Sequence, residues 1–339
     1  MKTMKNFMKC FVAGFVMVLT FFVTNTNVQA ETFKDGLQIS SNLLNKYGET
    51  DIILGDVTNL QQTAATETSI TVSWNPVVGA ESYYIADTDG KEIYPLDKTQ
   101  NTSYTITYPQ NTIVGVIVYP VFANEELGNP TGIVVSTLPA KISGVGYDEV
   151  FAHDKKLQVS WYRSQVADGY EAICYNKKGK VVQKIDVPES ESYSFAKINT
   201  TFSKTNTQNI YYVVVKGYIL INNNTKKVYG AASNKFYAVP QPKLDKKVSL
   251  YHVDENYINV KWAKVKGATS YMIYVSTKQN SGYKKVATVK SNSYKITKFK
   301  GKTLNIRKTD YYFKIVTVGK FGKKTVKSKS YYLYGRNKK

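Results

Sequence analysis

Few side chains in this sequence belong to the types that carry out covalent chemistry. The 339-residue chain holds two cysteines and two histidines, His153 and His252. Cys174 would act as a nucleophile only beside a base, and no motif places either histidine next to it. A single cysteine within an alternating apolar run is typical of a buried strand residue. We therefore expect no catalytic site.

Patterns for metals and cofactors are equally weak. Neither histidine has a neighbour at the spacing of zinc ligands. The stretch Asp87-Thr88-Asp89-Gly90 resembles the start of a calcium loop, but the later ligands and the closing glutamate are missing. A hairpin turn explains it better, and the sequence also lacks a phosphate-binding glycine loop and a nucleophile elbow. We expect a protein that is not an enzyme and that needs no cofactor or metal.

Lysine is the abundant charged side chain, and it is unevenly distributed. Residues 31–138 hold 4 Lys and Arg against 13 Asp and Glu, residues 139–239 hold 14 against 8, and residues 240–339 hold 25 against 4. The net charges of these segments are −9, +6 and +21. A segment as basic as the last one is the electrostatic footprint of a protein that binds a polyanion.

Nine lysines of this basic segment are the candidate polyanion-binding residues. They are Lys284, Lys285, Lys298, Lys300, Lys302, Lys323, Lys324, Lys327 and Lys329. Arginine is scarce beside them, which disfavours bidentate recognition of single phosphates. Tyrosines alternate with these lysines, but this is ordinary strand composition, so nucleic acid is disfavoured. Solvated lysines that keep strand edges from pairing explain the same residues, and both interpretations stay open.

The elements that carry these side chains are indicated by the three tryptophans. Trp74, Trp161 and Trp262 each end an alternating run (SITVSW, KLQVSW and YINVKW), which predicts half-buried strands. Each Trp is followed nine residues later by a tyrosine that opens another alternating run. The repeat length of about ninety residues suits tandem β-sandwiches.

The repeated spacing has a physical explanation. We expect each Trp to lie between two sheets and the Gly-Ala pair after Trp74 and Trp262 to reverse the chain. The tyrosine then begins the next strand, facing the same core. In the second copy Val166-Ala167 replaces Gly-Ala, which predicts a less sharp turn. The predicted structural core residues are Trp74, Trp161, Trp262, Tyr83, Tyr170 and Tyr271.

These units resemble fibronectin type III domains, and the third is similar to the Lys- and Tyr-rich version found in tandem on extracellular bacterial proteins. In the third unit the resemblance is carried by Trp262, Val265, Gly267, Ala268, Tyr271, Ile273, Tyr274, Tyr311, Tyr312, Phe313, Ile315 and Val318. In the second it is carried by Trp161, Tyr170, Tyr211 and Val215. The resemblance implies a seven-stranded sandwich with its Trp on the second strand and no required disulfide. In the first unit Ile113-Val114 replaces the paired tyrosines, which leaves the register of that late strand open.

The beginning of the chain has the pattern of a secretory signal. Lys2, Lys5 and Lys9 precede an apolar run at residues 10–23, and Val28-Gln29-Ala30 suits signal peptidase. The apolar run is shorter than the ~20 residues that span a bilayer, and we expect no transmembrane segment in the mature chain. The expected organisation is a signal peptide at 1–30, a leader at 31–55 and fibronectin type III domains at 56–138, 139–239 and 240–339.

The sequence therefore predicts a secreted, extracellular or cell-surface protein that binds or presents without catalysing a reaction. Its basic last domain is expected to dock on anionic cell-wall or glycan polymers, and other extracellular proteins are further candidate partners. One alternative is an adhesin that binds glycans through exposed tyrosines. Another is an accessory subunit of an extracellular hydrolase, which the family resemblance allows. The sequence does not select the ligand among these.

Overall fold

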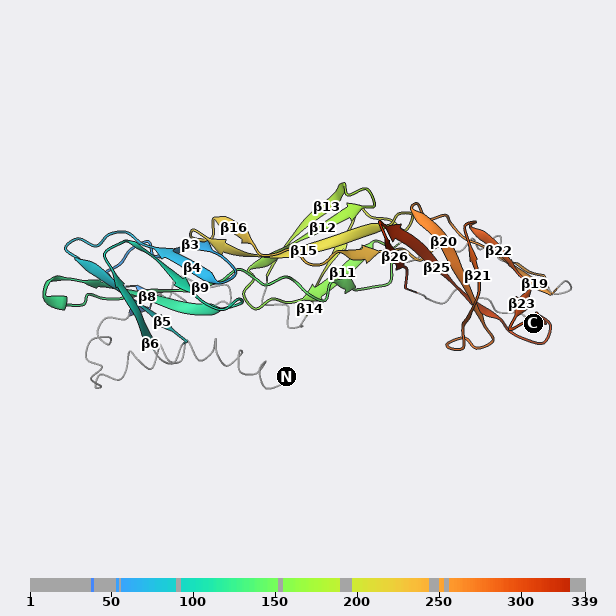
Figure 1. The fold of residues 1–339 in the computed structure, drawn as a ribbon, viewed down its shortest axis with the longest axis horizontal. Helices are drawn as coiled ribbons and strands as arrows, with labels where there is room; N and C mark the ends of the chain where they lie inside the picture. Colours follow the sequence, from blue (N-terminus) through green and yellow to red (C-terminus); the bar gives the residue numbers. More distant parts are fainter. Residues whose placement is uncertain are drawn as a thin grey trace.

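The computed structural model describes residues 38–39, 53–54, 56–89, 93–151, 155–189, 197–243, 250–252 and 256–329. Three β-sandwiches, called units 1, 2 and 3, follow one another along an extended molecule in the order of the sequence (Figure 1). The described elements are strands and one short 3₁₀ segment, Ala123–Glu125. The predicted all-β fold of three tandem sandwiches is confirmed. The expected signal peptide lies outside the described residues.

Unit 1 packs a three-stranded sheet against a larger one. The small sheet has the order β3-β4-β7, and the larger sheet has the order β1-β2-β9-β8-β5-β6. The strands are β1 (Gln38–Ile39), β2 (Ile53–Leu54), β3 (Gln61–Ala65), β4 (Ser69–Ser73), β5 (Ser82–Thr88), β6 (Ile93–Thr99), β7 (Ser103–Thr107), β8 (Ile113–Val121) and β9 (Thr131–Ser136). Two pieces of the expected leader, β1 and β2, therefore extend this sheet beyond β9.

Unit 2 repeats this arrangement without the extra strands. Its small sheet has the order β10-β11-β14, and its larger sheet has the order β13-β12-β15-β16, with β17 also paired to β15. The strands are β10 (Gly146–Tyr147), β11 (Leu157–Tyr162), β12 (Gly169–Asn176), β13 (Val181–Pro188), β14 (Lys197–Phe202), β15 (Tyr211–Ile221), β16 (Lys226–Tyr229) and β17 (Phe236–Ala238). The last strand of the sandwich is thus divided into β16 and β17, which pair with opposite ends of β15.

Unit 3 has the same two sheets and one additional hairpin. The small sheet has the order β18-β19-β22, the larger sheet has the order β21-β20-β25-β26, and β23 pairs with β24. The strands are β18 (Leu250–His252), β19 (Tyr257–Lys261), β20 (Ala268–Ser276), β21 (Lys284–Val289), β22 (Ser293–Ile296), β23 (Lys298–Phe299), β24 (Lys302–Thr303), β25 (Tyr312–Phe321) and β26 (Lys324–Lys327).

The tryptophans lie where each small sheet faces the larger one. Trp74, Trp161 and Trp262 are 4%, 0% and 1% exposed. Trp74 and Trp262 directly follow the second strand of their sandwich, and Trp161 lies within it, one residue before its end. Each indole packs against the tyrosine nine residues later, with ring centroids 5.2, 5.6 and 5.2 Å apart. Because large aromatic side chains bury the most apolar area, these pairs are a major part of each core.

The same tyrosines also close the turn that follows each tryptophan. The hydroxyls of Tyr83, Tyr170 and Tyr271 accept a hydrogen bond from the backbone N–H six residues upstream, each at 2.8 Å. Gly79 and Gly267 take φ values of +84° and +91° in these turns, which residues with a Cβ rarely adopt. The ring contact with Trp and the hydrogen bond to the Tyr hydroxyl both hold this turn in place. Together they explain why the Tyr lies nine residues after the Trp in every unit.

The late strand of unit 1 keeps the register of the other units despite its changed sequence. Ile85 of β5 pairs with Val118 of β8, as Ile273 of β20 pairs with Ile315 of β25. A continuous run of mostly aliphatic residues thus gives β8 the position that the tyrosine-led strands hold in units 2 and 3.

In units 2 and 3, one hairpin of the larger sheet contacts the preceding unit (Figure 1). The turn between β15 and β16 contacts unit 1, where Asn222 N–H donates to the Gln62 carbonyl at 2.8 Å. The turn between β25 and β26 contacts unit 2, where the Phe321 ring lies 4.6 Å from that of Tyr237. The corresponding end of β8 and β9 in unit 1 lies at the free end of the molecule (Figure 1).

Units 2 and 3 are joined by shared packing. Ile210 and Val239, both 1% exposed, belong to the hydrophobic core of unit 3, although Ile210 directly precedes β15 of unit 2. Lys266 N–H donates to the Gln208 carbonyl at 2.6 Å, and the Lys177 ammonium donates to the Gly267 carbonyl at 3.0 Å. The two units therefore meet through buried side chains as well as through the connecting chain.

Candidate polyanion-binding surface

The nine lysines singled out from the sequence are all exposed and lie in three places on unit 3. Lys284 and Lys285 lie on β21, which is one edge of the larger sheet. The group from Lys323 to Lys329 lies on and beside β26, at the opposite edge of that sheet. Lys298, Lys300 and Lys302 lie in the hairpin of β23 and β24. The structure therefore divides the candidate set and does not bring it together as one site.

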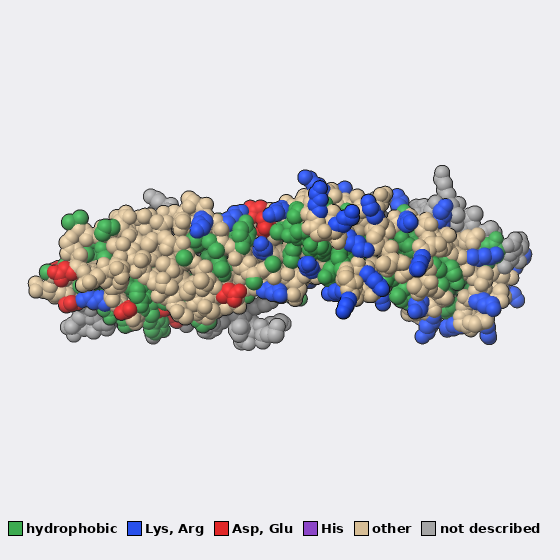
Figure 2. Space-filling model, turned by 45° about the horizontal axis from the view of Figure 1, so that its top comes forward, with side chains coloured by type: hydrophobic (Ala, Val, Ile, Leu, Met, Phe, Trp, Pro, Cys, Tyr) green, Lys and Arg blue, Asp and Glu red, His purple; other side chains and the backbone are tan. Residues whose placement is uncertain are grey.

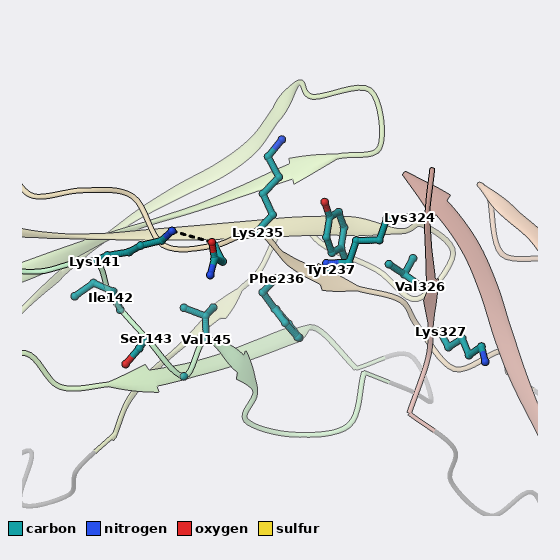
Figure 3. Close-up of a pocket in the computed structure, with 12 residues that line it drawn as sticks. Lys141, Ile142, Ser143, Val145, Lys235, Phe236, Tyr237, Lys324, Val326 and Lys327 are labelled. Atoms are coloured by element: carbon teal, nitrogen blue, oxygen red, sulfur yellow. Dashed lines mark hydrogen bonds between the residues drawn. The ribbon is translucent and has the colours of Figure 1, made fainter. Parts of the chain in front are cut away.

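The group at β26 is the one that meets another unit. A cavity of about 510 Å³, called the junction cavity, opens between β26, β17 and the chain that enters unit 2 (Figure 3). Its lining consists of Lys141, Ile142, Ser143, Gly144, Val145, Asn234, Lys235, Phe236, Tyr237, Lys324, Val326 and Lys327. Two lysines of unit 2 thus join two of the nine candidates.

The charge of this lining is entirely positive. Lys141, Lys235, Lys324 and Lys327 contribute to it, and no carboxylate does. Lys141 donates a hydrogen bond to the Asn234 side-chain oxygen at 2.8 Å, and none of the four forms an ion pair within the described part of the chain. An anion placed in this cavity would therefore meet positive charge from both units and no negative charge from the lining.

Aromatic rings lie directly beside these lysines. Four half-buried rings, called the aromatic ladder, run from unit 2 to unit 3: Tyr175, Tyr212, Tyr237 and Phe321. Successive ring centroids are 4.7, 6.3 and 4.6 Å apart. Because Val213 next to Tyr212 is fully buried in the core, alternation along β15 places the Tyr212 ring on the outer face of the sheet.

Two of the cavity lysines cover rings of the ladder. The Lys235 ammonium lies 4.8 Å from the centroid of Tyr212, and that of Lys324 lies 4.6 Å from the centroid of Tyr237. Such cation–π contacts stabilise exposed sites by about 0.5–1 kcal/mol.

The same pairing of lysine with aromatic rings recurs elsewhere and has a purely structural interpretation. Lys295 lies 3.6 Å from the ring centroid of Tyr257, and Lys314 lies 3.9 Å from that of Tyr283. A lysine stem that packs on a tyrosine covers apolar area while its charge stays in water. Richness in Lys and Tyr therefore does not by itself require a ligand. The junction cavity differs from these isolated pairs because four lysines line the same cavity.

Residues considered for covalent or metal chemistry have other environments. Cys174 is fully buried in the core of unit 2, and this burial raises the pKa of its thiol to about 12. Asp87 accepts a hydrogen bond from the Tyr108 hydroxyl at 2.6 Å. Among the described residues, no group of three or more His, Cys, Asp or Glu is placed to hold a metal ion. His153 lies outside those residues, and His252 ends β18.

The described residues include no helix with the length and hydropathy needed to cross a bilayer. In each unit a small sheet of three strands faces a larger sheet, and the tryptophan lies at the end of the second strand or within one residue of it. The fold is that of tandem fibronectin type III domains. This assignment depends on the strand order of the three sandwiches.

No family model matches the chain, and no curated protein sequence matches it. Among solved structures, the FN1–FN3 domains of chicken CNTN1 are similar at 15% identity and a TM-score of 0.28, covering 83% of this chain and 99% of that one. A two-domain fibronectin type III segment of chicken tenascin is 16% identical with a TM-score of 0.26, covering 53% and 96%. The central fibronectin-III array of RIM-binding protein is 14% identical with a TM-score of 0.20, covering 82% and 96%.

The sequence pointed to the basic half of the site and missed the other half. Lys324 and Lys327 stand in a lysine-rich run, whereas Lys141 and Lys235 stand in segments of ordinary charge. Only the way the β25–β26 hairpin docks on unit 2 brings the two pairs together. Pro139 and Pro240 flank unit 2 and indicate where it meets its neighbours. This is the sequence signal for the place of the cavity, because a junction of two domains is where binding clefts often form.

Proposed function

We propose that this protein is an extracellular, non-enzymatic array of binding domains that attaches to anionic polymers of a cell envelope through units 2 and 3. The observation that carries the proposal is the junction cavity, whose lining includes four lysines and no carboxylate. On the face drawn in Figure 2, basic side chains are spread over units 2 and 3, while acidic ones lie mostly toward unit 1. A polyanion would therefore hold the molecule by its basic part and leave unit 1 directed outward.

The expected strength of this attachment follows from the number of lysines that line the cavity. A lysine near an anionic surface contributes about 1 kcal/mol, so four would contribute about 4 kcal/mol, which is roughly a thousandfold in affinity. This contribution is screened beyond a Debye length, which shrinks from about 30 Å at 0.01 M salt to about 8 Å at 0.15 M. Attachment should therefore weaken strongly as salt is raised.

The test is retention of the mature chain, residues 31–339, on purified anionic cell-wall polymer over a series of salt concentrations. A neutral polysaccharide of similar length serves as the control surface. We expect retention on the anionic polymer at low salt, release as the salt concentration rises and no retention on the neutral polymer. Retention that is unchanged by salt, or equal on both surfaces, would contradict an electrostatic attachment.

A second candidate function, glycan binding, is favoured by the aromatic ladder. Its rings are half-buried and run from unit 2 to unit 3, and the flat face of a sugar could pack against them. Sugar-specific retention that persists in high salt would support this function over simple attachment to charge.

A further inference from the structure

We infer that the junction cavity and the adjoining aromatic ladder form one binding site for an acidic polysaccharide, a chain of sugar rings that carry carboxylates. The inference depends on the proposed attachment to polyanions and narrows it to one place and one class of ligand. Lys141, Lys235, Lys324 and Lys327 would bind the carboxylates, and the rings beside them would contact the sugars.

The site belongs to neither unit alone. Lys141 and Lys235 come from unit 2, whereas Lys324 and Lys327 come from the last strand of unit 3 (Figure 3). Ile210, which is buried in the core of unit 3, fixes the two units against each other. The cavity is therefore formed before any ligand arrives, and little freedom is lost on binding.

The composition of the lining favours sugars over bare phosphates. Beside the four cations lie apolar and aromatic side chains, including Val145, Phe236 and Val326. A flexible phosphate polymer has no flat apolar face to place against these side chains, whereas a sugar ring has one. A wall that combines apolar area with a few well-placed polar groups is also the usual composition of a small-molecule site.

The choice of lysine also suits carboxylates that are spread along a chain. Lysine presents a compact charge on a flexible stem, whereas arginine presents a fixed fork that matches a single phosphate or carboxylate. All four cations that line the cavity are lysines. The site can therefore follow carboxylates at variable positions along a polymer.

The lysines that cover the ladder couple the two parts of the site. Lys324 lies over Tyr237, and Lys235 lies over Tyr212. When either ammonium turns toward a carboxylate, it uncovers the ring beneath it for contact with a sugar. One movement thus supplies both the ionic and the apolar contact.

The test compares two double variants that remove the same charge from opposite edges of one sheet. Lys324→Gln with Lys327→Gln alters the junction cavity, and Lys284→Gln with Lys285→Gln alters β21, far from it in the strand order. Binding of the mature chain to polygalacturonate is measured for both by titration at constant salt. We expect the β26 pair to weaken binding at least tenfold more than the β21 pair.

A third variant, Tyr237→Leu, tests the class of ligand. It should weaken binding to polygalacturonate and leave binding to inorganic polyphosphate of similar length unchanged. Thermal unfolding of each variant shows whether it is folded, and the two lysine pairs decide the location even if Tyr237→Leu is unstable.

Each outcome bears on a different claim. Equal weakening by the two lysine pairs would overturn the junction site and leave a diffuse polyanion surface standing. Equal loss of both polymers in a folded Tyr237→Leu variant, or tighter binding of the wild type to polyphosphate, would overturn the assignment to polysaccharides. Failure of the wild type to bind either polymer would overturn the proposed attachment itself.

Discussion

Replacing Tyr271 by phenylalanine should destabilise unit 3 much more than the loss of one oxygen atom suggests. The Tyr271 hydroxyl accepts the hydrogen bond of the Val265 N–H at 2.8 Å, and Val265 is 2% exposed. The ring itself would stay in place against Trp262. The variant therefore leaves a buried donor without a partner and changes little else.

The magnitude follows from the cost of an unsatisfied buried donor. Leaving a buried N–H unpaired costs about 1–3 kcal/mol, and we expect about 2 kcal/mol here because the ring packing is kept. For a domain of this size, each kcal/mol lowers the midpoint of thermal unfolding by about 4–8 °C, so unit 3 should lose about 8–16 °C.

The assay is hydrogen-exchange mass spectrometry of residues 31–339 at increasing urea concentration. Peptides from β20 and β25 report the opening of unit 3, and peptides from β5 and β8 report that of unit 1. The matched control is Tyr294→Phe in the same unit, because the half-buried Tyr294 hydroxyl forms no hydrogen bond with the described residues. It should change stability by less than about 0.5 kcal/mol.

The reasoning would be refuted if Tyr271→Phe and Tyr294→Phe shifted the opening of unit 3 by the same amount. A shift that appeared first in unit 1 would also refute it, because the lost hydrogen bond lies wholly within unit 3.

Two further predictions concern the core of unit 2 and its contact with unit 3. Burial raises the pKa of the Cys174 thiol to about 12, so a thiol reagent at neutral pH should modify Cys174 only as fast as unit 2 opens. Immediate reaction of Cys174 in the absence of denaturant would contradict its buried placement. Replacing Phe321 by alanine removes the ring that packs on Tyr212 and Tyr237. Small-angle scattering should then show a broader range of angles between units 2 and 3, while each unit stays folded. An unchanged scattering profile would contradict this and show that the other contacts hold the two units in place.

Much of the fold could be predicted because its main signals are local. Alternation up to each tryptophan identifies a strand and its buried face from neighbouring residues alone. The spacing of nine residues from Trp to Tyr is equally local, since it spans one turn and the start of the next strand. The prediction of three sandwiches, and of the burial of Trp161 and Tyr170, needs no information from more distant residues.

The arrangement between units could not be predicted in the same way. Alternation along β15 gives Ile210 the outward phase of Tyr212, and nothing local in the sequence says that it enters the core of unit 3. Sequence proximity likewise groups Lys284 with Lys324 as basic residues of one domain. The strand order places β21 and β26 at opposite edges of a sheet, which separates them. Pairing of distant strands and docking of whole domains are non-local, so no short window of sequence contains them.

Because Ile210 and Val239 belong to the core of unit 3, the core of unit 3 depends on residues from unit 2, whereas the core of unit 2 does not depend on unit 3. Among the described residues, the core of unit 2 runs from Ile142 to Ala238, whereas the core of unit 3 includes Ile210 and Val239, which precede its own strands. Domains of a growing chain fold from the N-terminus onward, so unit 2 can complete its interior before unit 3 has been made. Trimming the protein from its C-terminus should therefore leave well-folded remainders, while trimming unit 2 away would take part of the interior of unit 3 with it.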